Sequence, residues 1–357
     1  MKEFLLRIVL RFWQLPLGIK RFFAPLIRSL MIIIPSPKVK SIKKDIDELS
    51  HRFGVELSKK VRNDILNSSI LFGSSPHEYF LFKFLKRDVY DRANFLTDAF
   101  RIQLLKKYIG IDLFKNEIVN KYGFYLHQSD FFHRPVMLFS KATSYNEFEA
   151  FVKESGGVFC KENSGSFGHN ARKINDTDES ALKDIYSGLI LSGTDWILEG
   201  YIVQDERMSS WNQSSVNTIR IPSYLIDNGF TVFVPFIRTG RKGAEVDNAG
   251  AGGIFAAIDE KTGKIITDGA DESGNFYLFH PDSKITYKGW QVPEWENLLA
   301  FAAEAHSRMK HHKYIAYDFA LTQDGWVLVE GNWGQYMCQQ TSTQKGFKKQ
   351  FINLLIS

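Results

Sequence analysis

Residues 315–332, IAYDFALTQDGWVLVEGN, form the segment that most restricts how this chain can fold. Two runs of strand composition, YDFAL and WVLVE, flank TQDG, which is typical of a tight turn, so the segment predicts a β-hairpin. Asp318, Glu330 and Asn332 lie near the open end of that hairpin. Carboxylates are rarely buried in strands unless they are paired, so these three residues need a partner.

A metal ion is one such partner. Glu330 and Asn332 are two residues apart and share a face of their strand, and Asp318 can come opposite them across the turn. Mg²⁺ takes a few protein oxygens together with water and nucleotide phosphates. Two carboxylates brought together raise the pKa of one of them unless a cation lies between them. The pattern therefore favours a metal site over the alternative, a hydrogen-bonded structural pair.

The rest of the chain predicts an α+β protein with antiparallel sheets. Strand-like runs occupy 135–139, 157–163, 171–175, 196–202, 217–227, 230–240 and 252–259. Residues 61–112 have a helical pattern, and the lysine-rich residues 38–60 before them predict a polar linker running into a helix. Further helices are expected at 144–155, where Ser144 and Glu147 form a capping-box pattern, at 293–309 and near 344–356.

Residues 158–174, VFCKENSGSFGHNARKI, read as a strand, a loop of small residues and a second strand. The loop contains Ser164, Gly165, Ser166 and Gly168. Small residues let backbone N–H groups approach phosphate oxygens, and Lys161 at the end of the first strand adds positive charge. A plain turn is the alternative, and the spacing of a Walker A loop is absent.

Two later segments place charged residues at strand ends. In DWILEGYIVQDE, Glu199 closes an apolar strand and Gly200 permits a change of direction beside an adenine edge, with Asp205 as a candidate for the ribose. A solvated strand end is the alternative for Glu199. In SSVNTIRIPSYLID, Asn217 and Arg220 begin a strand, and an Arg between two Ile residues must find an anion or reach water. Phosphate suits its forked geometry.

A long polar loop covers residues 238–253, RTGRKGAEVDNAGAGG. Arg238 and Arg241 precede a glycine run, which suits an anionic substrate, whereas an ordinary hairpin loop is the alternative. Histidines gather later in the chain, at His280, His306, His311 and His312. They lack a metal-ligand spacing, so a surface role is predicted for each.

Charge is distributed unevenly along the chain. Residues 1–44 carry ten Lys and Arg against one acid, and since the whole chain carries +5, the other 313 residues sum to −4. A mildly acidic body argues against nucleic acid as a partner. Cys160 and Cys338 are the only cysteines and make no disulfide framework, so a reducing cytoplasm is the simplest compartment.

The basic N-terminal arm alternates apolar clusters with single cations. No window of about 18 residues is free of charge, which argues against a spanning helix. One helical face collects Phe4, Leu5, Ile8, Val9 and Phe12. Such a face beside cations suits a helix lying in the headgroup layer of an anionic membrane. A helix packed on the body of the protein or on a second subunit is the alternative.

The chain resembles the ATP-grasp superfamily in the order of four features. These are the Lys strand with its loop, the Glu-bearing turn, the Asn/Arg strand and the Asp…Glu-x-Asn hairpin. The segments SVNTIRI, GAEVDNAGAGGIFAAID and YMCQQ resemble sequences of its sugar-transfer-associated group. The resemblance covers residues 114–357. It implies two α+β subdomains enclosing ATP between antiparallel sheets, at 113–200 and 201–357. A basic arm at 1–44 and a helical region at 45–112 precede them.

The resemblance also implies roles for single residues. Lys121 and Lys161 hold the phosphates of ATP, residues 164–168 cover them, and Glu199, Gly200, Tyr201 and Asp205 belong to the nucleotide site. Asp318, Glu330 and Asn332 bind one or two Mg²⁺ ions, or Mn²⁺. The catalytic group comprises Arg220, Asn217, Arg238 and Arg241. Many superfamily ligases carry Arg two residues before the metal-binding Asp, but this chain has Ala316, so an Arg from that group must serve instead.

The activity that the resemblance implies is ligation of a carboxylate to an amine or similar nucleophile through an acyl phosphate, with release of ADP and phosphate. The group name implies a role in making or modifying a cell-surface polysaccharide or its lipid-linked precursor. The substrates would be small-molecule or glycan-linked carboxylates and amines. The expected location is the cytoplasm or the inner face of the cytoplasmic membrane. An oligomer is compatible with the sequence. Two alternatives stay open: a kinase of a sugar or alcohol, and a non-catalytic nucleotide-binding scaffold.

Overall fold

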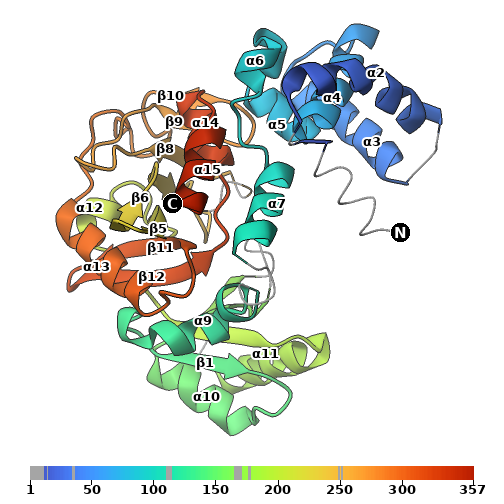
Figure 1. Cartoon of the computed structure of the whole chain (residues 1–357). Coiled ribbons are helices and arrows are strands. Elements are labelled where there is room, and N and C mark those ends of the chain that lie inside the picture. Colours follow the sequence, from blue (N-terminus) through green and yellow to red (C-terminus); the bar gives the residue numbers. More distant parts are fainter. Residues whose placement is uncertain are drawn as a thin grey trace. The chain divides into compact units, whose positions relative to one another are not determined.

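The computed structural model describes residues 12–13, 15–33, 37–109, 115–164, 171–175, 178–247, 250 and 252–357 (Figure 1). The chain divides into two compact units, each considered by itself. The first comprises Met1–Gly110, Ala270–Phe276 and Gln335–Ser357, and the second comprises Ile111–Gly269 and Tyr277–Gly334. Helices and antiparallel sheets confirm the predicted α+β class, with several helices preceding the strands.

The first unit is helical. Its elements are α2 (Leu17–Ile33), α3 (Pro37–Arg52), α4 (Lys59–Phe72), α5 (Pro76–Leu81), η1 (Phe84–Lys86), α6 (Val89–Arg92), α7 (Asp98–Tyr108), α14 (Met337–Thr343) and α15 (Lys348–Ile356). The linker predicted for 38–60 is wrong over most of its length, because α3 occupies it. Ile46 is buried and Leu49 and Phe53 pack against the same core, so helical spacing of a few apolar residues outweighs the polar composition.

Aromatic rings fill the core of this unit. Phe82 and Phe95 have ring centroids 4.9 Å apart, and Phe84 meets Phe95 edge-to-face at 5.4 Å. Ser75 and Glu78 form a capping box at the start of α5, and the buried Glu78 carboxylate also accepts a hydrogen bond from the backbone N–H of Asp98 at 2.6 Å. The cap therefore ties α5 to the start of α7.

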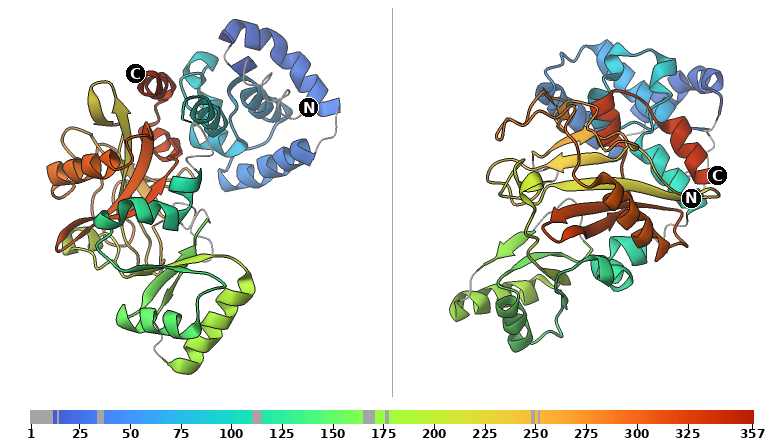
Figure 2. Two further views of the ribbon diagram at one scale, coloured as in Figure 1. Left: turned by 60° about the horizontal axis from the view of Figure 1, so that its bottom comes forward. Right: turned by 90° about the vertical axis from the view of Figure 1, so that its left-hand side faces the viewer.

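The second unit contains a small four-stranded sheet. It runs in the order β1 (Val136–Phe139), β4 (Trp196–Gly200), β2 (Val158–Glu162) and β3 (Arg172–Ile174), all antiparallel. Helices α10 (Tyr145–Glu154) and α11 (Glu179–Ser192) share one apolar core with these strands (Figure 2). The capping box predicted from Ser144 and Glu147 is confirmed. Helix α11 was not expected from the strand-rich pattern of this region.

The second unit also contains a larger antiparallel sheet. Its strands run in the order β8 (Ile254–Ala257), β7 (Phe236–Thr239), β5 (Thr218–Ile226), β11 (Tyr314–Thr322) and β12 (Gly325–Asn332), and β6 (Gly229–Val232) also pairs with β5. The remaining elements of the unit are π-helix η2 (Lys115–Val119), α9 (Lys121–Gln128), η3 (Ser129–Phe131), α12 (Glu206–Ser209) and α13 (Trp295–Ser307). The chain passes between the units at β9 (Gly269–Ala270) and β10 (Phe276–Tyr277). The predicted hairpin of residues 315–332 is confirmed as β11 and β12.

The surface role predicted for four histidines is wrong for three of them. His280, His306 and His312 are fully buried. Backbone carbonyls explain how they are accommodated: His280 donates from Nε2 to the Gly240 carbonyl at 2.9 Å, and His306 donates from Nε2 to the His312 carbonyl at 2.8 Å. Ser223 of β5, whose hydroxyl donates to the Ile315 carbonyl, lies 2.8 Å from His306 Nδ1 and helps to hold the ring between α13 and the sheet.

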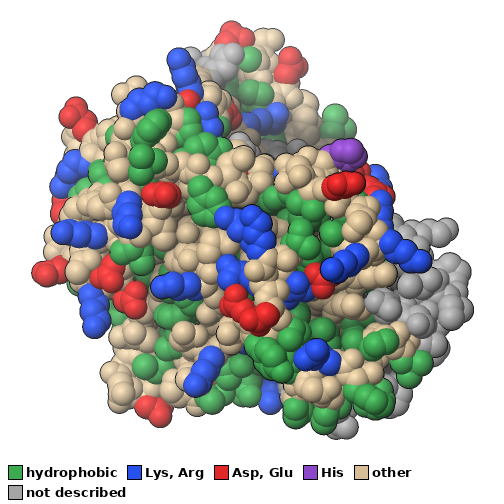
Figure 3. All heavy atoms as spheres, turned by 90° about the horizontal axis from the view of Figure 1, so that it is seen from above, with side chains coloured by type: hydrophobic (Ala, Val, Ile, Leu, Met, Phe, Trp, Pro, Cys, Tyr) green, Lys and Arg blue, Asp and Glu red, His purple; other side chains and the backbone are tan. Residues whose placement is uncertain are grey.

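Basic and acidic side chains are interspersed over the face shown in Figure 3. Across the described residues, none of the helices has both the length and the apolar character needed to cross a membrane.

The buried His306 predicts a pH dependence of stability. Burial lowers its pKa from 6.5 to about 4, so between these pH values the unfolded chain binds a proton that the folded chain does not. We expect this residue to lower the free energy of unfolding as pH falls through that window, by roughly 1.4 kcal/mol per pH unit. In urea titrations, His306→Gln should give a shallower pH profile than the wild type. The exposed His51→Gln serves as the control, and parallel profiles for all three proteins would contradict the assignment.

Candidate functional site

Strand register places the predicted acids beside an arginine. Asp318 on β11 pairs with Glu330 on β12 and with Arg220 on β5, and a bulge follows directly after Asp318. Asn332 lies two residues beyond Glu330 and so shares its face of the strand. The three predicted metal ligands thus come together at one place on the larger sheet, with an arginine across from them.

Two arginines bind the fully buried carboxylate of Asp318. Arg220 donates from Nε to Oδ1 and from Nη2 to Oδ2, each at 2.5 Å, and Arg238 on β7 donates from Nη2 to Oδ2 at 2.9 Å. Asn332 adds its amide N–H at 3.1 Å. Arg238 also lies 3.4 Å from the Asp247 carboxylate, so the two arginines face two carboxylates, and a further anion beside them needs additional cations.

Glu330 is that further anion within the protein. Burial by itself raises the pKa of Glu330, but Lys161, Lys121 and Arg220 together lower it to about 2, so the carboxylate is ionised. The Asn332 amide also donates to Glu330, at 3.1 Å. Repulsion between Asp318 and Glu330 is therefore relieved by the protein's own cations. The argument that such a pair calls for a metal ion loses its force, and the case for a metal rests on the oxygen donors themselves.

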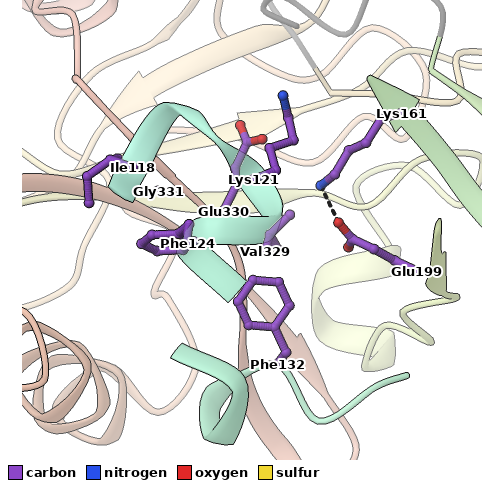
Figure 4. Close-up of a pocket in the computed structure, with 9 residues that line it drawn as sticks. All are labelled: Ile118, Lys121, Phe124, Phe132, Lys161, Glu199, Val329, Glu330 and Gly331. Atoms are coloured by element: carbon purple, nitrogen blue, oxygen red, sulfur yellow. Dashed lines mark ion pairs between the residues drawn. The ribbon is translucent and has the colours of Figure 1, made fainter. Parts of the chain in front are cut away.

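A small pocket opens beside Glu330 (Figure 4). It is lined by Ile118, Lys121, Phe124, Phe132, Lys161, Glu199, Val329, Glu330 and Gly331. Apart from Phe132, which follows η3, these residues come from η2, α9, β2, β4 and β12, so both sheets of the second unit contribute. Apolar side chains beside two lysines suit a ligand that has a flat apolar part and an anionic part.

Glu199 lies between two cations on the small-sheet side of the pocket. Lys161 Nζ lies 2.7 Å from its Oε1, an ion pair marked in Figure 4, and Arg134 donates from Nη2 to its Oε2 at 2.5 Å. Burial opposes ionisation, but Lys161 and Arg134 hold the pKa of Glu199 below its usual value. Arg134 also donates to the Leu328 carbonyl of β12 at 2.7 Å, which links the two sheets. Sequence reasoning missed Arg134, because it lies in an irregular segment without a motif.

Helix α9 is positioned by an asparagine that sequence reasoning also missed. Asn163 follows β2, and its carbonyl and its side-chain Oδ1 accept hydrogen bonds from the backbone N–H groups of Lys121 and Tyr122, at 3.0 and 2.8 Å. Lys121 is thereby fixed at the pocket. Burial lowers the pKa of Lys121, while the nearby Glu330 opposes that shift.

The arrangement of two sheets around a lysine-lined pocket can now be compared with known proteins. The sequence model of the sugar-transfer associated ATP-grasp family matches residues 137–354, more than half of the chain. The chain belongs to the sugar-transfer associated ATP-grasp family. The predicted ATP-grasp fold is therefore confirmed. Among the curated proteins, none matches this chain.

Solved structures with similar folds are ligases by name. D-alanyl-alanine synthetase A from Vibrio cholerae O1 biovar eltor is 13% identical, with 68% of this chain and 66% of that chain covered and a TM-score of 0.41. D-alanine–D-alanine ligase from Bacillus anthracis is 14% identical, with 67% and 66% covered and a TM-score of 0.40. ATP-grasp ligase PsnB with minimal precursor, Mg and ADP is 12% identical, with 75% and 68% covered and a TM-score of 0.42. The chain spans about two thirds of the length of these structures.

The nucleotide residues expected in this ATP-grasp protein lie in several environments. Gly200 ends β4 where an added Cβ would come 2.9 Å from Pro135, so the chain makes a close approach there. Tyr201 donates its hydroxyl to Asn175, and Asp205 caps α12 and pairs with Arg207 at 2.7 Å. Neither Tyr201 nor Asp205 lines the pocket described above. Ser164 is exposed after β2, and Gly165, Ser166 and Gly168 lie outside the described residues.

The predicted catalytic residues separate into two groups. Arg220 and Arg238 reach Asp318, whereas Arg241 is partly exposed and pairs with Asp282 at 2.8 Å. Asn217 is fully buried, and its amide donates to the backbone carbonyls of Met208 and Asn212, at 3.1 and 2.8 Å. Its side chain supports the neighbouring chain segments instead of facing the pocket.

Position 316, where many superfamily ligases carry an arginine, is Ala316 here, and the arginines that contact Asp318 come from other strands. Ala316 pairs with Pro222 on β5 and with Asn332 on β12, and the two arginines reach Asp318 from β5 and β7. Asp247, from the long loop after β7, lies 3.4 Å from Arg238 and accepts hydrogen bonds from the Thr218 backbone and hydroxyl. The loop thus folds back onto the arginine that serves Asp318.

The buried triad of Lys161, Glu199 and Arg134 predicts a strong effect of a small change. Glu199→Gln removes the only charge shared by both cations, so we expect the free energy of unfolding to drop by about 3–5 kcal/mol in urea titrations. The double variant Arg134→Met/Glu199→Met should recover much of that loss. It leaves only Lys161 without Glu199, whereas the single variant leaves both Lys161 and Arg134 without it. A single variant within about 0.5 kcal/mol of the wild type would contradict the network.

Proposed function

We propose that this protein is an ADP-forming, Mg²⁺-dependent ligase that joins a carboxylate to an amine through an acyl phosphate. The observation that carries the proposal is that cations and acids meet at one place. Lys121 and Lys161 lie beside Glu330, and the neighbouring Asp318 is bound by Arg220 and Arg238. Membership of the ATP-grasp family supports ATP as the substrate. The family description supports a role in making or modifying a cell-surface polysaccharide.

The donor set at the hairpin fits a hard divalent cation. Asp318, Glu330 and Asn332 offer carboxylate and amide oxygens, which Mg²⁺ and Mn²⁺ prefer. Glu330 lines the lysine-lined pocket, and Asn332 hydrogen-bonds to both Glu330 and Asp318. These three residues would hold one or two such ions. The ions would neutralise charge on the phosphates of ATP.

The protein's own residues have separate tasks in this scheme. Lys121 and Lys161 bind and orient phosphate oxygens, and Arg220 and Arg238 place positive charge where negative charge develops. A substrate carboxylate oxygen attacks the γ-phosphorus, the bond between that phosphorus and the β,γ-bridging oxygen breaks, and ADP leaves. The amine then attacks the acyl carbon, a C–N bond forms, phosphate leaves and the amine loses a proton. Buried side chains that are already fixed by hydrogen bonds lower the reorganisation needed for these steps.

The N-terminal arm supports a second part of the proposal, attachment to an anionic membrane surface on the cytoplasmic side. Helix α2 turns Leu17, Lys20, Ala24 and Ile27 toward the core of the first unit. The opposite side of the helix exposes Ile19, Phe22, Phe23 and Leu26, with Phe22 exposed to 79%, and Leu15 just before the helix is also exposed. We call these five residues the α2 apolar face. An exposed apolar face within a segment of net charge +9 suits lipid headgroups.

The inward side of α2 makes this orientation costly to reverse. Lys20 is buried and donates from Nζ to the Leu71 carbonyl at 3.2 Å, and burial lowers the pKa of this amine. Trp13 donates from its indole N–H to the Ile70 carbonyl at 2.9 Å. The helix therefore keeps a lysine inside and phenylalanines outside. This combines the two alternatives considered from sequence, because one side packs on the body and the other can contact a membrane surface. Among the residues of the predicted arm face, Phe4, Leu5, Ile8 and Val9 lie outside the described residues.

Ligase activity predicts a strict dependence on two substrates. With the full chain, ATP, Mg²⁺ and a panel of small carboxylates and amines, we expect ADP release only when one member of each class is present. Asp318→Asn should lower that rate by at least about 100-fold, because it removes an oxygen donor and an anchor for two arginines. ADP release with a hydroxyl acceptor alone would replace the proposal with a kinase. ATP binding without turnover, unchanged by Asp318→Asn, would replace it with a nucleotide-binding scaffold.

The α2 apolar face predicts binding to lipid vesicles. We expect the full chain to sediment with vesicles rich in phosphatidylglycerol and much less with phosphatidylcholine vesicles, with binding weakened by salt. Phe22→Ser/Leu26→Ser should abolish most of the binding. Leu191→Ser on α11 is the matched control, since Leu191 is an equally exposed apolar residue at 84% on another element. A double variant that keeps vesicle binding but changes the oligomeric state would assign the face to a second subunit.

A further inference from the structure

A second group of candidate ligands lies outside the nucleotide pocket. Among the described residues, Glu117, His311 and His312 bring their ligand atoms within 4.8 Å of one another. Glu117 Oε2 is 2.5 Å from His311 Nε2 and 2.8 Å from His312 Nε2. Two imidazoles that come from one turn thus converge on one carboxylate oxygen from π-helix η2.

The backbone explains how adjacent histidines can face the same group. In a strand, neighbouring side chains point to opposite faces, and in a helix they are about 100° apart. His311 and His312 instead lie in the turn between α13 and β11, where the His312 backbone N–H donates to the Met309 carbonyl at 2.8 Å. The buried His306 donates to the His312 carbonyl and fixes the turn from inside. A pattern search for ligand spacing cannot find such a pair.

Burial and protonation suit the group to metal binding. The His312 side chain is 1% exposed, and burial lowers its pKa, although Glu117 opposes that shift. Burial opposes ionisation of Glu117, but its hydrogen bonds to His311 and His312 hold its pKa below the usual value. A neutral imidazole and an ionised carboxylate are the forms that coordinate metal ions. His311, at 46% exposure, keeps one side of the group open to water.

We propose that Glu117, His311 and His312 form a binding site for a divalent transition-metal ion of the zinc class, with water completing the coordination. Two imidazoles and one carboxylate are a donor set that suits zinc and its neighbours far better than Mg²⁺. Ligand atoms around tetrahedral zinc are about 3.3 Å apart, so the hydrogen-bonded atoms need to separate by less than about 1 Å. The Nε2 protons that now bridge to Glu117 move to Nδ1 or to solvent when the ion binds.

The site would join two segments that lead into the nucleotide pocket. Glu117 directly precedes Ile118, which lines the pocket, and Lys121 begins the next helix. On the other side, β11 starts at Tyr314, two residues after His312, and carries Asp318. A bound ion would therefore fix the spacing between the segments that present Lys121 and Asp318. This consequence rests on the proposed function, whereas the metal site itself does not.

The test measures binding of Zn²⁺ and Co²⁺ to the full chain after chelator treatment, in the presence of excess Mg²⁺ to fill the hairpin donors. Competition with a chromogenic chelator should give one tight Zn²⁺ site, and Co²⁺ should give a visible absorption band typical of low coordination number. We expect His311→Asn and Glu117→Gln each to weaken Zn²⁺ binding by about 10- to 100-fold or more. His311 is largely exposed, so its replacement should leave the circular dichroism spectrum unchanged.

Two control variants keep the result specific. His51→Asn on α3 and His133→Asn in the second unit replace exposed histidines outside the group, and both should retain the tight Zn²⁺ site. Absence of tight Zn²⁺ in the wild type, or tight binding that survives both His311→Asn and Glu117→Gln, would overturn the proposal and leave a hydrogen-bonded cluster. Because the measurement needs neither ATP nor turnover, its failure would not bear on the ligase proposal, and a failed ligase assay would not bear on this site.

Discussion

The buried carboxylate of Asp318 is the constraint around which the second unit is organised. A charge at zero exposure is tolerated only with partners in place, and Arg220, Arg238 and Asn332 supply them from β5, β7 and β12. Four neighbouring strands must therefore keep their register for the core to remain neutralised. The same requirement brings together Arg220 and Arg238, the cations that a phosphate-bearing substrate would need. The stability of the sheet and the chemistry proposed for it therefore depend on the same contacts.

Local rules predicted the parts of the fold that short segments determine. The β11–β12 hairpin follows from strand composition and turn residues, and two-residue periodicity placed Glu330 and Asn332 on one face. The capping box of α10 followed in the same way. Helix α3 was missed because most of its residues are polar and only a narrow stripe of apolar residues packs on the core. Overall composition does not distinguish that stripe from the exposed residues.

Partners that come together from distant segments could not be predicted. Arg134 reaches Glu199 across 65 residues and belongs to no motif, and the pair of His311 and His312 depends on one turn. The repulsion argument for a metal at the hairpin failed for a related reason: Lys121 and Lys161 arrive from other elements and neutralise Glu330. Sequence spacing indicates which residues share a face, but it does not count the charges that the fold later brings beside them.

Arg134 has a mechanical consequence for how the two sheets of the second unit can move. Its guanidinium binds Glu199 on the small sheet and the Leu328 carbonyl on the large one, with its side chain only 4% exposed. Moving one sheet away from the other would break one of these two contacts, because Glu199 and Leu328 lie on different sheets. A change at Arg134 would therefore affect both sheets at once, although this residue belongs to neither of them.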